Sequence, residues 1–84
     1  MPRAATLRVA VFAGMADLVG GMVVELPWSG GTAADARRLV ADRHPATAAL
    51  LARSAVAVGS RYVPDDEPLA ASDDVAIIPP VSGG

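Results

Sequence analysis

The sequence contains no cysteine and no lysine, and only one residue each of phenylalanine, tryptophan and tyrosine. The absence of cysteine excludes a disulfide framework, a thiolate zinc site and a thiol nucleophile. The absence of lysine excludes Schiff-base chemistry and isopeptide attachment at a side chain, because every basic side chain is an arginine or His44. The sequence shows no nucleophile–base pair and no metal-ligand cluster, so an independent catalyst is the least favoured class.

Long hydrophobic runs and a strong charge of one sign are also absent. No apolar run approaches the roughly 20 residues that span a bilayer. Arg8 interrupts the apolar stretch Thr6–Ala13, and no signal-peptide cleavage pattern follows it, so we expect a cytoplasmic protein with no membrane partner. The net charge of −2 offers no basic surface for nucleic acid. The acidic residues at 65–67 and 73–74 match no metal-binding loop, and we predict no metal site.

The first part of the chain indicates two short strands. With 84 residues, the chain is predicted to form one small domain over residues 1–84. Alternating apolar residues predict a strand over Thr6–Ala13, and Met15–Val19 is expected to form one helical turn closed by glycine. A second strand, Met22–Leu26, is expected to pair antiparallel with the first and to stop at Pro27.

A capped helix follows. Thr32 is typical of a helix N-cap, and Asp35 three residues later gives an acidic capping box. The helix is expected to end at His44, because the residue before proline avoids the α region. Arg38 and Asp42 are predicted to form a solvent-exposed i,i+4 pair. The stripe expected to pack on a sheet consists of Ala36, Leu39 and Val40.

The remaining segments complete an α+β pattern. Pro45–Arg53 suggests a short second helix, Ala55–Gly59 a strand, Ser60–Val63 a strand or a turn, and Val75–Pro79 the last strand. Leu69, in the loop between them, is expected to turn inward. One main helix can cover only one face of a sheet. The order of elements therefore predicts the β-grasp (ubiquitin-like) fold, a small mixed sheet packed on one main helix.

The face of the sheet away from the helix is a candidate interaction surface. If Val75 and Ile77 point inward, Phe12, Ala76 and Ile78 have no obvious cover. An exposed apolar patch on a small domain usually marks a binding surface. Arg8 is expected on the same side and is a candidate partner contact, whereas Arg37, Arg38 and Arg61 are expected to form a solvated face.

The last residues are predicted to form a functional tail over residues 79–84. Pro79 and Pro80 follow an apolar strand and restrict the backbone, which reduces the entropy lost when a tail inserts into a partner. Gly83 and Gly84 have no Cβ and suit narrow binding sites. The pattern predicts a stiff exit and a flexible Gly-Gly tip that presents the carboxylate of Gly84.

These residues resemble the MoaD/ThiS sulfur carriers, which are prokaryotic relatives of ubiquitin. The resemblance is greatest to the branch that forms the small subunits of molybdopterin synthase. It lies in Phe12-Ala13, Leu18-Val19-Gly20, Leu69, Asp73-Asp74-Val75-Ala76 and the tail Pro79-Pro80-Val81-Ser82-Gly83-Gly84. The chain departs from the family at Ala16-Asp17, where Arg-Glu is common, and at Ile77-Ile78, where an aromatic residue is common. These departures affect how tightly a partner is held.

The resemblance implies a function in molybdenum cofactor biosynthesis. A ubiquitin-activating-type adenylating enzyme uses ATP to adenylate Gly84, and a sulfur donor (a sulfurtransferase or desulfurase) converts it to a thiocarboxylate. The large subunit of molybdopterin synthase then uses this sulfur on the cyclic pterin precursor. The chain itself is implied to be a non-catalytic small subunit that binds no cofactor. The implied site comprises Gly84 and Gly83 for the chemistry, and Phe12, Arg8, Ile78, Pro79, Pro80, Val81 and Ser82 for partner binding.

Two alternatives remain open at the sequence level. The chain could carry sulfur for another pathway, such as thiamine or cysteine synthesis, although the thiamine carriers usually lack the double proline. It could also be a ubiquitin-like binding module whose tail is never activated.

Overall fold

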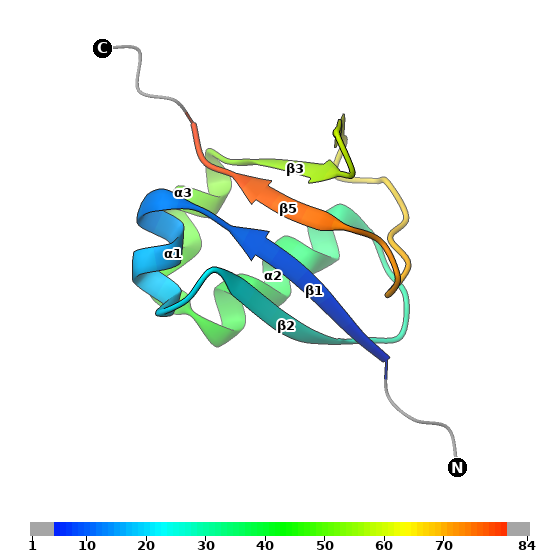
Figure 1. Ribbon diagram of the computed structural model, residues 1–84, viewed down its shortest axis with the longest axis horizontal. Helices are drawn as coiled ribbons and strands as arrows, with labels where there is room; N and C mark the ends of the chain where they lie inside the picture. The colour runs from blue at the N-terminus through cyan, green and yellow to red at the C-terminus, as the bar shows by residue number, and fades with distance from the viewer. Residues whose placement is uncertain (1–4, 81–84) are drawn as a thin grey trace.

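A computed structural model describes residues 5–80 and shows a single sheet with helices behind it (Figure 1). The elements in chain order are β1 (Ala5–Val11), α1 (Ala13–Val19), β2 (Val23–Trp28), α2 (Ala33–Arg43), the 3-10 turn η1 (Pro45–Thr47), α3 (Ala48–Ala52), β3 (Ala55–Val58), β4 (Arg61–Val63) and β5 (Val75–Ile78). No helix within the described residues is long and apolar enough to cross a membrane.

The last strand lies in the middle of the sheet. The strand order is β2-β1-β5-β3-β4, in which β5 pairs parallel with β1 and antiparallel with β3. The two flanking pairs, β1–β2 and β3–β4, are antiparallel. This mixed sheet packed on one main helix, α2, confirms the predicted β-grasp fold.

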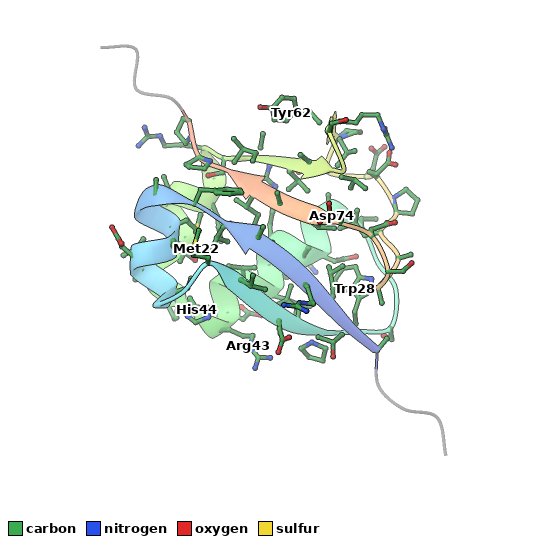
Figure 2. The ribbon with its side chains drawn as sticks, viewed as in Figure 1. Met22, Trp28, Arg43, His44, Tyr62 and Asp74 are labelled. Carbon is green, nitrogen blue, oxygen red and sulfur yellow. The ribbon has the colours of Figure 1, made fainter. Side chains whose placement is uncertain are left out.

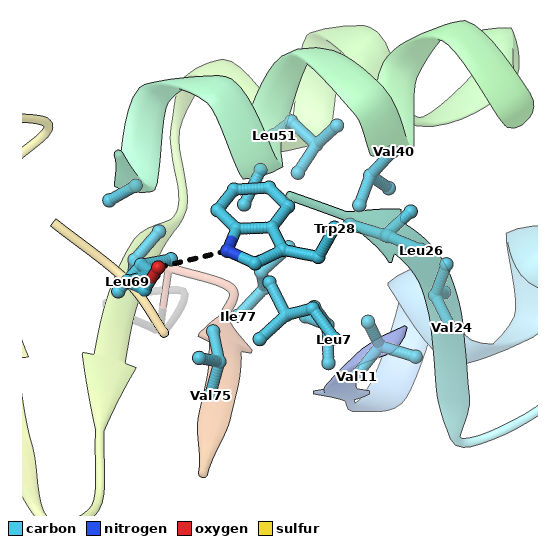
Figure 3. Close-up of a cluster of buried hydrophobic side chains, with 14 of the residues drawn as sticks. Leu7, Val11, Val24, Leu26, Trp28, Val40, Leu51, Leu69, Val75 and Ile77 are labelled. Carbon is cyan, nitrogen blue, oxygen red and sulfur yellow. Dashed lines mark hydrogen bonds between the residues drawn. The ribbon is translucent and has the colours of Figure 1, made fainter. Parts of the chain in front are cut away.

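The hydrophobic core lies between the sheet and the helices (Figure 3). Trp28 spans it and its indole Nε1–H donates to the Leu69 carbonyl at 2.8 Å, which satisfies the buried donor. Leu69 is buried, as predicted. The fully buried large side chains include Leu7, Val9, Val11, Met15, Leu26, Val40, Val56, Val75 and Ile77.

The predicted N-cap of α2 is confirmed. The Thr32 side chain accepts from the Asp35 backbone N–H, and the Asp35 carboxylate accepts from the Thr32 backbone N–H at 2.9 Å. Ala33 and Ala34 donate their N–H groups to carbonyls in the 65–67 segment, each at 2.9 Å. The donors that a helix start leaves without partners are therefore shared between the capping box and the loop before β5.

Arg37 is not solvated, and that prediction was wrong. Its side chain is only 21% exposed and pairs with the Asp65 carboxylate at 2.9 Å. It also donates to the Leu51 carbonyl and, at 2.6 Å, to the Ser54 carbonyl. Arg37 thereby ties α2 to the end of α3 and to the loop after β4, a connection that only the tertiary structure reveals.

One other prediction for α2 needs correction. Arg38 pairs with Asp35 at 2.9 Å, one turn earlier, instead of with Asp42. The capping box already holds the Asp35 carboxylate in place, so Arg38 finds a fixed partner there. The predicted packing stripe is confirmed: Ala36 and Val40 are buried, and the half-buried Leu39 packs against the core.

Pro27 does not end the second strand, which continues to Trp28. Val11 donates its N–H to the Met22 carbonyl, so the even-numbered residues of β2 carry the hydrogen bonds to β1. Pro27, an odd-numbered residue opposite Thr6, therefore lacks only an N–H that would face away from β1. Because β2 is an edge strand, this position tolerates proline.

Candidate functional site

The predicted tail begins directly after a strand that is paired on both sides. β5 is hydrogen-bonded on both sides, to β1 and to β3, and ends at Ile78. Pro79 is half-buried and Pro80 is exposed just beyond it. The remaining predicted tail residues, Val81, Ser82, Gly83 and Gly84, lie outside the described residues. The position from which the tail starts is thus set by the centre of the sheet.

The face of the sheet that the helices leave uncovered faces the viewer in Figures 1 and 2 and is called here the outer face. Strand alternation sends every second side chain to it. The register aligns one row of outer-face residues across all five strands: Val23, Ala10, Ala76, Ala57 and Tyr62. The middle of this row is alanine on three adjacent strands. The centre of the outer face is therefore apolar, and its side chains project little from the sheet.

Phe12 and Ile78 lie together where the tail begins. Val11 pairs with Ile77, which puts the next residues, Phe12 and Ile78, side by side. Phe12 is the N-cap of α1, and its ring is 41% exposed. Ala13 has a positive φ of 51°, an uncommon conformation for a residue with a side chain, and turns the chain sharply out of β1. Phe12 and Ile78 are therefore placed together, directly before Pro79 and Pro80 in the chain.

Arg8 is on the outer face but at its other end. It lies four residues before Phe12, about 13 Å along the strand. Its side chain is 70% exposed and forms a long ion pair with Glu25, at 3.7 Å. Arg8 lines a shallow depression of about 420 Å³ together with Thr6, Ala10, Val23 and residues 71–75. The outer face thus has an apolar end at the tail and a charged end at Arg8.

The sequence reasoning missed Tyr62. Its side chain is 67% exposed and stands above Ala57 at the β4 edge of the outer face (Figure 2). The segment 60–63 had been left open as a strand or a turn. Had it been assigned as a strand, the alternation with the buried Val63 would have placed Tyr62 outward. Leu18, Met22 and Val23 are further exposed apolar side chains that the prediction did not include.

The titratable group with a perturbed pKa lies away from this face. Hydrogen bonds from the backbone and the side chain of Thr32 lower the pKa of the Asp35 carboxyl, and Arg38 lowers it further. Asp35 caps α2 and has a structural role. Within residues 5–80, no cluster of three or more His, Asp or Glu residues is placed to hold a metal ion.

The domain thus combines a β-grasp fold with an exposed apolar area beside the end of β5, and comparison with known proteins assigns its class. The family model of the ThiS family matches residues 9–84. A molybdopterin synthase sulfur carrier subunit from Dictyostelium discoideum is 30% identical over 81 residues, covering 92% of this chain and 94% of that protein. The chain belongs to the ThiS family of sulfur carriers, which confirms the resemblance found in the sequence.

Solved structures agree with this assignment. SAMP1 from Haloferax volcanii is 27% identical, with a TM-score of 0.80 over 94% of this chain and 99% of that one. A structure assigned to molybdopterin converting factor subunit 1 of Pyrococcus furiosus is 28% identical, also with a TM-score of 0.80, over 93% of this chain and all of that one (100%). The similarity therefore extends over nearly the whole domain in both cases.

Proposed function

We propose that this chain is the sulfur-carrying small subunit of a molybdopterin synthase, acting in the cytoplasm. The observation that carries the proposal is that the 79–84 segment directly follows the central strand β5, next to the exposed Phe12 and the half-buried Ile78. A central strand gives the tail a fixed origin, and the apolar area beside it gives a partner a surface to hold. The similarity to a molybdopterin synthase sulfur carrier subunit supports the choice of pathway.

The chemistry takes place at the carboxyl group of Gly84. A carboxylate is a poor electrophile, so an adenylating partner first joins it to AMP at the expense of ATP. A persulfide on the sulfur donor attacks the adenylate and displaces AMP, which forms an acyl disulfide. A thiol then reduces this disulfide and leaves a thiocarboxylate, whose sulfur takes the nucleophilic role that cysteine usually has. Transfer of this sulfur to the cyclic pterin precursor, in the active site of a large subunit, returns the carboxylate.

In this proposal the carrier supplies positioning and its partners supply the catalytic side chains. Phe12, Ile78 and Tyr62 contact the partner around the tail, and Arg8 contacts it at the charged end. Val81 and Ser82 line the entry to the partner's active site, and Gly83 and Gly84 fit its narrowest part. The same tip enters at least two different enzymes, which favours residues without side chains.

The test of this mechanism is the variant Gly84→Ala in a reconstituted reaction with the adenylating enzyme, the sulfur donor and the large subunit. A Cβ at the tip should obstruct both active sites, so we expect adenylation and sulfur transfer to fall while the fold stays intact. The matched control is Gly21→Ala, which adds the same Cβ to a glycine outside the tail that has no atom within 4 Å of it. Near-normal adenylation and transfer by the Gly84 variant would contradict the proposal.

A second candidate is a protein modifier, and the similarity to SAMP1, a small archaeal modifier protein, favours it. The activated carboxyl would then be attacked by an amine of another protein and form an amide. Since this chain has no lysine, lysine-linked chains of it cannot form, and a lysine in any conjugate belongs to the acceptor protein. ATP-dependent conjugates on a denaturing gel would support this function; sulfur transfer without conjugates would exclude it.

The two alternatives left open by the sequence have their own tests. If sulfur serves another pathway, a pull-down should recover a different acceptor enzyme in place of a molybdopterin synthase large subunit. If the tail is never activated, a tag added after Gly84 should leave the function unchanged.

A further inference from the structure

The outer face is complementary to itself across β1 and β5. The parallel register, with Val9 opposite Val75, produces three successive outer-face rows on these two strands. Ala10 lies beside Ala76. Continued by two residues in each direction, the same register puts Arg8 beside Asp74 and Phe12 beside Ile78. Each row thus holds either two opposite charges, two small residues or two large apolar residues.

Consider a second copy that packs its outer face on the first, related to it by a two-fold axis parallel to the strands and midway between β1 and β5. Rotation about this axis places β1 of each copy over β5 of the other. This operation sets Arg8 of one copy against Asp74 of the other, and it forms that ion pair twice. Ala10 meets Ala76 at the centre, where small side chains allow two sheets to approach to about 10 Å. Phe12 of each copy meets Ile78 of the other at the apolar end.

The charges needed for this contact are accessible. The Arg8 side chain is 70% exposed, and its ion pair with Glu25, whose side chain is 63% exposed, is long, at 3.7 Å. Asp74 is exposed and takes part in none of the ion pairs that residues 5–80 form. Figure 2 shows Asp74 on the near side of the sheet, close to β5. Both groups line the same depression of the outer face.

We propose that the chain, when free of other partners, forms a symmetric dimer through its outer face, with Arg8 and Asp74 pairing across the interface. The dimer buries Phe12 and Ile78, which are otherwise the apolar surface beside the tail. Because a partner enzyme needs the same face, the dimer and the partner complex exclude each other, and the partner releases the monomer by mass action. The inference rests on the register and charges of the sheet and stands whether or not Gly84 is activated.

Sedimentation velocity of the full untagged chain over a series of concentrations tests this proposal. We expect the sedimentation coefficient to rise towards that of a dimer. Arg8→Asp and Asp74→Arg each set like charges against each other and should weaken the dimer about 10-fold or more. The double variant Arg8→Asp/Asp74→Arg exchanges the charges and should restore the dimer.

Two controls distinguish this dimer from non-specific self-association. Arg43→Asp, on the far end of α2, should leave the association unchanged (Figure 2). Tyr62→Ala should also leave it unchanged, because the proposed axis puts β4 of one copy beyond the β2 edge of the other. A monomer at every concentration, a dimer that neither charge reversal weakens, or a double variant that stays monomeric would overturn the proposal. Since no activating enzyme is present, these outcomes are independent of the test of sulfur transfer.

Discussion

At the scale of single residues, Gly31 has the least freedom to change. Its φ of +143° disfavours a side chain, and an added Cβ would lie 2.8 Å from the Asp35 carboxylate that caps α2. We expect Gly31→Ala to lower the free energy of unfolding by about 2 kcal/mol, measured by urea denaturation. The matched control is Gly30→Ala, which also has a positive φ (+107°) but has no atom within 4 Å of the new Cβ. Equal losses for the two variants would show that the contact with Asp35 is unimportant.

Asp35 should make the stability depend on pH. Its pKa in the folded protein lies below the ordinary 3.8, because the Thr32 backbone N–H, the Thr32 hydroxyl and Arg38 favour the carboxylate. A lowered pKa contributes stability that is present above the unfolded pKa and is lost as pH falls through the folded pKa. Asp35→Asn should therefore reduce stability at neutral pH, and its difference from the unaltered protein should shrink below pH 3.8. Urea denaturation at several pH values measures this, and a difference that does not vary with pH contradicts it.

At the scale of elements, Arg37 holds α2, α3 and the loop after β4 together. Arg37→Met keeps the aliphatic stem but removes the donors to the Leu51 and Ser54 carbonyls. We expect it to cost about 2 kcal/mol of unfolding free energy, because those acceptors lose a charged donor. The control Arg38→Met removes an ion pair whose arginine is 67% exposed and should change stability by less than about 0.5 kcal/mol. Comparable losses in thermal unfolding would refute the structural role of Arg37.

The elements also show where sequence reasoning succeeds and where it stops. The capping box at Thr32, the burial of Leu69 and the order of elements follow from local patterns, and the structure confirms them. The continuation of β2 through Pro27 depends on the position of the strand at the sheet edge, which the sequence does not state. The role of Arg37 depends on groups 14 to 28 residues away.

Some residues of the candidate site could likewise be placed from the sequence, and others could not. Phe12, Ile78 and Arg8 could be placed on one face from strand alternation alone. Tyr62 could not, because its strand has only three residues and gives too short a pattern to distinguish it from a turn. The sequence does not show that Arg8 lies far from the start of the tail, because this depends on the pairing of β1 with β5.

At the scale of the whole molecule, the outer face and the tail should act as one binding unit. Phe12→Ala and Tyr62→Ala each remove an exposed aromatic side chain at little cost to the core. Phe12 lies beside the start of the tail, and Tyr62 lies at the β4 edge of the outer face. We expect Phe12→Ala to weaken binding to a molybdopterin synthase large subunit about 30-fold, and Tyr62→Ala to weaken it less. Titration calorimetry measures this, with Arg43→Ala, at the C-terminal end of α2 and away from the start of the tail, as the control (Figure 2). Unchanged affinity in both variants would show that the partner binds another surface of the molecule.

The central claim is that sulfur is carried on the carboxyl group of Gly84. Intact mass spectrometry of the untagged chain, after incubation with ATP, the adenylating enzyme of its host and a sulfur donor, tests it most directly. The account predicts a mass gain equal to the replacement of one oxygen by sulfur, which fragmentation localises to Gly84. No gain, while a known sulfur carrier is converted under the same conditions, would contradict the account and favour a binding module whose tail is not activated.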